Sequence, residues 1–264
     1  MLTITGYPDR IYARPGDTIK FMVSCESEIT YRDDLVRIIC GDDNPDGPGY
    51  KEEELQSDIN GDYQGRKQHI HAGSYVSVSD ARPLRALDSF TVQAFIWPTT
   101  PLKGKQALIS KWDAASNSGF ALIIDETGSL AIDIGGNGAI ERVSVGAPLQ
   151  LKRWYRVGAA YDAASGTVRI FQIPILAVPD IADGGTKEQR VGVRMGSNRA
   201  ALLFAAMPGD KPSGLNFYYN GKIDGPVITS RALGEGDCEA LIGQTPQRLA
   251  FDIVGRWDFS KRMD

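Results

Sequence analysis

The sequence predicts an all-β protein, an antiparallel sandwich or barrel, and three observations support this prediction. Many short segments alternate apolar and polar side chains with the two-residue period of a β-strand. Turn-forming clusters separate these segments, and the chain contains 29 Gly and 14 Pro. Amphipathic helical patterns are almost absent. Short, evenly spaced strands of this kind are typical of sandwiches and barrels.

The composition narrows the class of protein. A chain of 264 residues is long enough for one large β domain or two smaller ones. Its formal net charge of -4 argues against general binding to nucleic acid or to an anionic membrane. The three cysteines are expected to be free thiols, with a Cys25–Cys40 disulfide as the alternative under oxidation. Because we find no secretion signal and no apolar run of about 18 residues, we expect a cytoplasmic protein.

The first part of the chain, residues 1–66, is expected to form a small β unit packed on a sandwich made by residues 67–264. Alternating side chains predict its first strands, at residues 2–5, 10–13 and 18–25. The apolar run at residues 33–40 is expected to be a strand buried on both faces. An irregular acidic loop follows at residues 41–49.

The sandwich is expected to begin at residue 67. Its predicted strands lie at residues 69–70, 75–79, 90–97, 106–112, 119–125, 130–134, 141–145, 191–195 and 222–229. Residues 175–189 and 205–213 are expected to be loop insertions, because Pro, Gly and small residues dominate both. An acidic start predicts one helical turn at residues 234–242, and residues 249–259 are expected to form the final strand.

The central element is a hairpin at residues 149–172. Trp154 and Arg156 alternate with Tyr155 and Val157, so the segment presents two faces, and the residues from Asp162 to Gly166 supply a turn. We expect Trp154 to point into the core, as large aromatic side chains in sandwiches often do.

Several motifs in this order resemble the laminin G/concanavalin A-like sandwich family. They are SFTVQAFIW at residues 89–97, ALISK at 107–111, GFAL at 119–122, RWYRV at 153–157 with Tyr161-Asp162, and NGKID at 220–224 followed by RAL at 231–233. The resemblance implies a jelly roll of two antiparallel sheets. Some relatives in this family bind calcium at a sheet rim, which makes Asp224 a candidate ligand, with Asp125 or Asp162 less favoured.

A second, narrower resemblance covers the whole chain. The segments TGYPD at residues 5–9, RPGD at 14–17, LVRIICGDDNPDGPG at 35–49 and WDFS at 257–260 are similar to the amino-terminal region of the large subunit of the N,N-dimethylformamidase family. That family hydrolyses small N-substituted formamides with a mononuclear iron. The resemblance implies that the iron ligands and catalytic residues lie outside this chain, so no catalytic residue is assigned here. It implies a catalytic portion or subunit as the partner, in a hetero- or homo-oligomer, and no cofactor in this chain.

Metal binding by the chain itself has two further candidate sites. The acidic loop carries Asp42, Asp43 and Asp46, whose oxygens suit calcium. The loop lacks the last glutamate of an EF-hand, so turn carboxylates that cap backbone amides are the favoured interpretation. His69 and His71 would face the same side of a strand, but no carboxylate or cysteine is spaced to complete a metal site with them.

The tyrosine pair Tyr218 and Tyr219 is the segment best suited to stacking on a sugar ring, with ordinary packing as the favoured alternative. Our leading hypothesis is a non-catalytic, structural or assembly region of a dimethylformamidase-like amidohydrolase, inactive by itself. The alternative is a laminin G-type module that binds carbohydrate or protein. A glycosidase is the weakest option, because fold alone does not imply activity.

Overall fold

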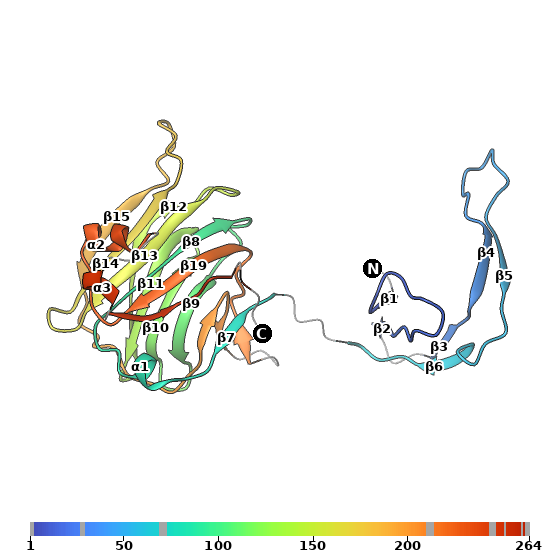
Figure 1. Cartoon of the computed structure of the whole chain (residues 1–264), viewed down its shortest axis with the longest axis horizontal. Coiled ribbons are helices and arrows are strands. Elements are labelled where there is room, and N and C mark those ends of the chain that lie inside the picture. The colour runs from blue at the N-terminus through green and yellow to red at the C-terminus, as the bar shows by residue number, and fades with distance from the viewer. Residues whose placement is uncertain are drawn as a thin grey trace. The chain divides into compact units, whose positions relative to one another are not determined.

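The structure is a computed structural model. It describes residues 3–26, 30–68, 73–209, 214–242, 247–250, 252–259 and 261. The chain divides into two compact units, Met1–His71 and Ala72–Asp264, which Figure 1 shows. The expected packing of the first unit on the second stays a prediction.

Among its described residues, the amino-terminal unit contains three antiparallel two-stranded ribbons. They pair β1 (Ile4–Pro8) with β2 (Phe21–Cys25), β3 (Thr30–Asp33) with β6 (Gly61–Gln64), and β4 (Val36–Cys40) with β5 (Lys51–Glu54). A ribbon without a second layer buries few side chains. Ile38 and Ile39 in β4 are each 59% exposed. The predicted burial of residues 33–40 on both faces is therefore wrong.

The predicted strand at residues 10–13 is also wrong. These residues lie in the loop that joins β1 to β2. The carboxylate of Asp9 accepts a hydrogen bond from the backbone N–H of Lys20 across this loop (3.0 Å). The side chain of Asp17 caps the turn by accepting from the N–H of Arg14 (3.0 Å). Asp9 and Asp17 thus shape this loop by accepting hydrogen bonds from backbone N–H groups.

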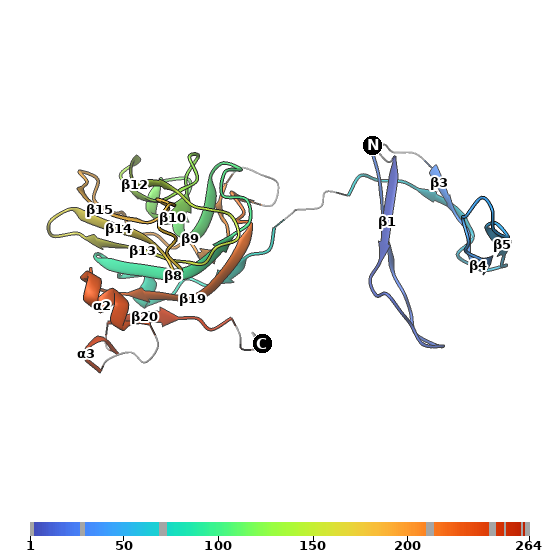
Figure 2. The ribbon, with the colours of Figure 1, turned by 90° about the horizontal axis from the view of Figure 1, so that it is seen from above.

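The second unit is built from two six-stranded antiparallel sheets, whose stacking is visible in Figure 2. The first has the order β12–β11–β10–β9–β16–β7 and the second β15–β14–β13–β8–β19–β20. The strands of the first sheet are β7 (Val76–Val78), β9 (Gln106–Asp113), β10 (Ser118–Ile124), β11 (Ser129–Gly136), β12 (Ala139–Pro148) and β16 (Leu202–Phe204). Those of the second are β8 (Phe90–Pro98), β13 (Tyr155–Asp162), β14 (Thr167–Pro174), β15 (Gly185–Arg190), β19 (Gly221–Thr229) and β20 (Ile253–Arg256). The predicted antiparallel sandwich is confirmed.

The core lies between these two sheets. Every second side chain of the central strands points into it, as the strand period requires. On β8 these are Phe90, Val92, Ala94 and Ile96, all of which are buried. The ring of Phe90 stacks on that of Phe120 from the opposite sheet, with 4.3 Å between centroids.

The central hairpin is confirmed, but its faces are opposite to those expected. β13 pairs with β14 over the whole hairpin and with β8 on its other side. Tyr155 points inward and is fully buried, whereas Trp154 is 38% exposed. The inward orientation predicted for Trp154 is wrong because the core-facing positions of β13 are the odd-numbered ones, which start with Tyr155.

The edges of the sandwich differ most from the predictions. All of β15 except Arg190 lies within the segment expected to be a loop, and the strand predicted at residues 191–195 is irregular. β15 is polar and largely exposed, so it pairs as an edge strand without an apolar face. Short pieces were also missed, namely β16, β17 (Met207–Pro208), β18 (Leu215–Asn216) and α1 (Arg82–Arg85). The strand predicted at residues 69–70 lies outside the described residues.

The end of the chain covers part of the second sheet. The predicted helical turn is present as α2 (Glu235–Ala240), and α3 (Gln247–Ala250) precedes β20. The predicted strand at residues 249–259 is therefore shorter, because α3 takes its first residues. Trp257 and Phe259 then pack edge-on against Phe204 of β16, with 5.0 and 5.6 Å between centroids. In the described parts of the chain, no helix is long and apolar enough to cross a membrane.

Candidate functional site

The outer face of the second sheet carries three aromatic side chains, of which Trp154 is exposed and Phe95 and Trp97 are half-buried. Because the core takes alternate residues of β8, Phe95 and Trp97 point to the outer face. Trp154 lies on the same face, directly before β13, and its carbonyl accepts the N–H of Ile175 (2.9 Å). Three aromatic rings from neighbouring strand positions thus lie on one side of the sheet.

The strand register arranges these side chains in rows across the sheet. One row runs from Asp224 through Phe95 and Arg156 to Ile173, as successive antiparallel partners on β19, β8, β13 and β14. A neighbouring row begins with Lys222 opposite Trp97. Side chains in such rows are close enough to contact one another. The two rows form one continuous surface.

A shallow hollow of about 300 Å³ lies on this surface. It is lined by Phe95, Trp154, Ile175 and Asp224. Close in sequence to Trp154 and Ile175, Leu151 and Leu176 are 57% and 77% exposed. We call the surface formed by Phe95, Trp97, Trp154, Ile175 and Asp224 the open face. Exposed apolar surface of this kind commonly marks an interaction site.

Two positive charges lie in these rows, and each of them already contacts another side chain. The ammonium group of Lys222 lies 4.9 Å from the centroid of the Trp97 ring. The guanidinium of Arg156 stacks on Phe171 at 4.8 Å and lies 3.5 Å from a carboxylate oxygen of Glu239. In contrast, the carboxylate of Asp224 has no hydrogen-bond or ion-pair partner within the described part of the chain.

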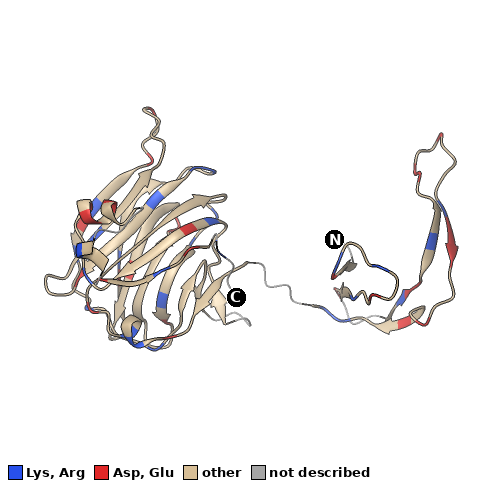
Figure 3. Ribbon diagram, in the orientation of Figure 1, with Lys and Arg blue, Asp and Glu red and all other residues tan. Residues whose placement is uncertain are grey.

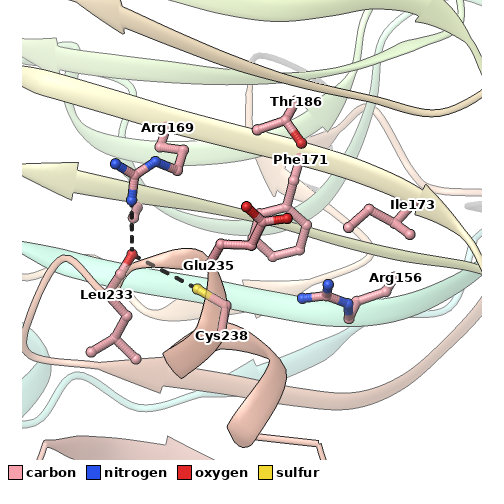
Figure 4. A pocket seen from close by; sticks show the side chains of 9 residues that line it. Arg156, Arg169, Phe171, Ile173, Thr186, Leu233, Glu235 and Cys238 are labelled. Atoms are coloured by element: carbon pink, nitrogen blue, oxygen red, sulfur yellow. Dashed lines mark hydrogen bonds between the residues drawn. The ribbon is translucent and has the colours of Figure 1, made fainter.

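The remainder of the outer face is closed by α2 and α3. Phe171 and Val227 pack there against Leu241 and Leu249. Figure 4 shows Cys238 of α2 directed toward the carbonyl of Leu233, to which Arg169 also points. Burial raises the pKa of the Cys238 thiol to about 11. The space left between these side chains is only about 10 Å³, so this region is a packed core.

The tyrosines proposed for sugar binding do not form a pair. Tyr219 is 6% exposed and belongs to the main core. Its hydroxyl donates to the carbonyl of Lys222 (3.4 Å), and burial raises its pKa. Tyr218 lies beside Tyr75, with 6.3 Å between ring centroids. Successive residues of an extended chain point to opposite sides, which separates the two rings.

Tyr219 does line an open groove of about 550 Å³ at one edge of the sandwich. Exposed Tyr75 and half-buried Phe259 line its walls, and Phe204 lies deeper. The groove runs between β7 of the first sheet and β19 of the second. Sequence reasoning did not find it, because its walls come from distant segments.

The acidic loop uses its side chains locally. Asp42 accepts a hydrogen bond from the N–H of Asn44 (2.9 Å), and Asn44 accepts one from the N–H of Asp46 (3.2 Å). These are the bonds expected of turn side chains that cap backbone amides. Calcium binding by Asp42, Asp43 and Asp46, or by Asp224 at the open face, stays a prediction.

No group of three His, Cys, Asp or Glu side chains suited to a metal ion occurs among the residues that the structure describes. His69 and His71 lie outside those residues. The described residues therefore do not offer a ligand set for the iron that the formamidase resemblance implies.

The buried carboxylates of the sandwich have structural partners. Asp133 forms an ion pair with Arg142 (2.6 Å) and another with Lys105 (2.9 Å). Asp183 accepts from the hydroxyl of Tyr155 and pairs with Arg153 (2.7 Å). These contacts compensate the cost of burying charge.

Asp125 and Asp162, the less favoured calcium candidates, also bond to local groups. Asp125 accepts from the hydroxyl of Ser144 (2.6 Å) and from backbone N–H groups. Asp162 accepts from the N–H of Ala164 (3.1 Å) in the hairpin turn. Both arrangements are typical of turn aspartates.

These features define the second unit as a concanavalin A-like sandwich of the laminin G type. The Laminin G 3 family, described as the concanavalin A-like lectin/glucanases superfamily, matches residues 71–172. Among solved structures, a "putative carbohydrate binding protein" from Bacteroides ovatus ATCC 8483 is similar, with a TM-score of 0.50. It is 17% identical and aligns over 79% of this chain and 59% of that one. This likeness concerns the fold alone.

Two curated relatives match almost the whole chain. The N,N-dimethylformamidase beta subunit of Paracoccus aminophilus is 38% identical over 97% of this chain and 35% of the relative. The protein of the same name from Alcaligenes sp is 37% identical over 98% of this chain and 36% of the relative. This chain thus spans about a third of the length of these relatives. The expected resemblance to a large subunit is wrong, since both matches are named beta subunit.

Proposed function

We propose that this chain is a non-catalytic assembly region of a dimethylformamidase-like enzyme. The observation that carries the proposal is the match of 97% of the chain to a dimethylformamidase beta subunit. Because the chain covers 35% of that relative, most of such a subunit lies outside the matched region. We assign hydrolysis of N-substituted formamides, and any iron, to that remaining portion.

The open face supplies a physical basis for assembly. Trp154 and Ile175 are exposed there. Burying apolar surface stabilises association by about 25 cal/mol per Å² before the costs of binding. In this proposal the open face packs against the catalytic portion.

Two measurements test the proposal. Purified alone, the chain is expected to release no amine from N,N-dimethylformamide and to contain no stoichiometric iron. Co-expressed with the part of the Paracoccus aminophilus beta subunit that it does not match, it is expected to co-purify with that part. Turnover by the chain alone would contradict the proposal.

A substitution on the open face locates the interface. Ile175→Asp is expected to abolish co-purification, because it buries a charge in an apolar contact. Ile140→Asp is the matched control, since Ile140 of β12 is 47% exposed compared with 56% for Ile175. Equal capture of both variants would exclude the open face as the interface.

The groove at the sandwich edge favours a second candidate, a binding module for carbohydrate. Its exposed ring, Tyr75, is 49% exposed and able to stack on a sugar. Binding on a glycan array that Tyr75→Ala abolishes, while the variant keeps its circular dichroism spectrum, would support this candidate. The absence of glycan binding by the unmodified chain would exclude it.

A further inference from the structure

The hollow in the open face combines two aromatic rings with one carboxylate. Phe95 and Trp154 present their rings, Ile175 adds an aliphatic wall, and Asp224 contributes the charge. Aromatic faces attract cations through the ring quadrupole. A carboxylate beside them adds an ion-pair partner. The lining therefore fits a positively charged group on an apolar stem.

We propose that this hollow binds an arginine or lysine side chain of the catalytic portion when that portion docks on the open face. The inference rests on the proposed assembly function and identifies the chemistry of the contact. The methylenes of such a side chain lie against Ile175, and its charged end lies between Trp154 and Asp224. Long cationic side chains commonly bury their stems in this way.

We infer a cationic occupant from the negative charge of Asp224. Asp224 is exposed in the free chain, where water solvates its carboxylate. Docking of an apolar surface would remove that water and leave the charge without compensation, which is unfavourable. Lys222 and Arg156 are engaged with Trp97, Phe171 and Glu239. The partner therefore has to supply the positive charge.

The hollow can be tested on the purified chain with small probes. We would titrate ¹⁵N-labelled protein with n-butylguanidinium and n-butylammonium chlorides at constant ionic strength, with n-butylurea as the neutral control. The indole N–H signal of Trp154, assigned with Trp154→Phe, is expected to shift saturably with both cations. It is expected to shift little with the urea. Equal shifts with the urea, or no saturable shift, would overturn the proposal.

A charge variant tests the role of Asp224. Asp224→Asn is expected to weaken binding of the cations about fivefold, the size of effect expected for an exposed ion pair. Asp58→Asn makes the same change at an exposed residue of the other compact unit and is expected to leave binding unchanged. Unchanged binding by Asp224→Asn would show that the carboxylate has no part in recognition.

Co-purification with the unmatched part of the beta subunit separates this proposal from the assembly function. Asp224→Arg is expected to abolish capture, because it places two positive charges together. If Ile175→Asp abolishes capture and Asp224→Arg does not, the cation proposal is wrong and assembly through the open face stands. If the unmodified chain captures nothing, the assembly function itself is wrong.

Discussion

Trp154 and Tyr155 are neighbours in the chain but have different roles. Tyr155 is fully buried, and its hydroxyl donates to Asp183 and accepts from the N–H of Gln150 (2.9 Å). Burial and the nearby Asp183 raise the pKa of Tyr155. Trp154 lies on the open face. The alternation of residues 153–161 predicted two faces, but not which of them is buried.

This difference predicts unequal losses of stability at the two positions. Tyr155→Phe is expected to lower the free energy of unfolding by about 1–3 kcal/mol, because it removes a partner of the buried Asp183. Trp154→Leu is expected to cost less than about 1 kcal/mol, since the side chain is partly exposed. Urea unfolding measures both. A larger loss for Trp154→Leu would contradict the assigned faces.

The carboxylate of Asp125 is expected to make a pH-dependent contribution to the free energy of unfolding. Burial works against its charge, but hydrogen bonds from Ser144, Thr127 and Ser129 outweigh this and lower its pKa below the usual range. The charged form is therefore favoured in the folded state. Its stabilisation is fully present above the unfolded pKa of about 4 and is lost as the pH falls through the folded pKa.

The corresponding experiment compares Asp125→Asn with the unmodified chain by urea unfolding across this pH range. The variant is expected to be less stable at about pH 7, and the difference is expected to shrink below about pH 4. A difference that stays constant with pH would show that ionisation of Asp125 does not stabilise the fold.

Among the elements, the central strands were predictable and the edge strands were not. β8 to β11 lie inside the two sheets, with a paired strand on each side. Their core-facing side chains must therefore be apolar, which gives the regular spacing seen in the sequence. β15 pairs only with β14 and is largely exposed, so its sequence, Gly185–Arg190, lacks an apolar pattern. Pairing of β15 depends on backbone hydrogen bonds. Nearly every residue type can form them, so they impose no side-chain pattern on the sequence.

The side chains packed around the short helix α2 are expected to contribute measurably to the free energy of unfolding. Leu241, directly after α2, is 3% exposed and packs in the cluster with Phe171 and Val227. Leu241→Ala is expected to lower the free energy of unfolding by about 2–4 kcal/mol, through lost burial and the cavity left behind. Ile242→Ala is the control, because Ile242 is 44% exposed. Equal effects of the two substitutions in urea unfolding would show that the α2 cluster does not stabilise the sheet.

At the scale of the whole molecule, the sandwich has its own core, to which, among the described residues, only those of the second unit contribute. Residues 72–264 are therefore expected to fold without the rest of the chain, with a cooperative urea transition. A fragment without a cooperative transition would show that the sandwich requires the amino-terminal unit.

Opposite charges face each other across one ribbon of the amino-terminal unit. Figure 3 shows acidic residues along β5, which is KEEE at Lys51–Glu54. Across from it, Arg37 of β4 forms an ion pair with Glu53 (3.7 Å). Both side chains are exposed, so this pair contributes little to stability. The amino-terminal unit is thus held mainly by ribbon pairing and local turns.

The sequence by itself determined the fold class and the central strands, because alternating side chains reflect which residues a sandwich core must bury. It also located the turns, whose residues act through local backbone geometry. Only the tertiary structure decided which side of β13 faces the core, that Tyr219 is buried, and that Asp224 lies beside Phe95 and Trp154. Those relations depend on register between strands far apart in the chain, and residue spacing along one strand does not encode them.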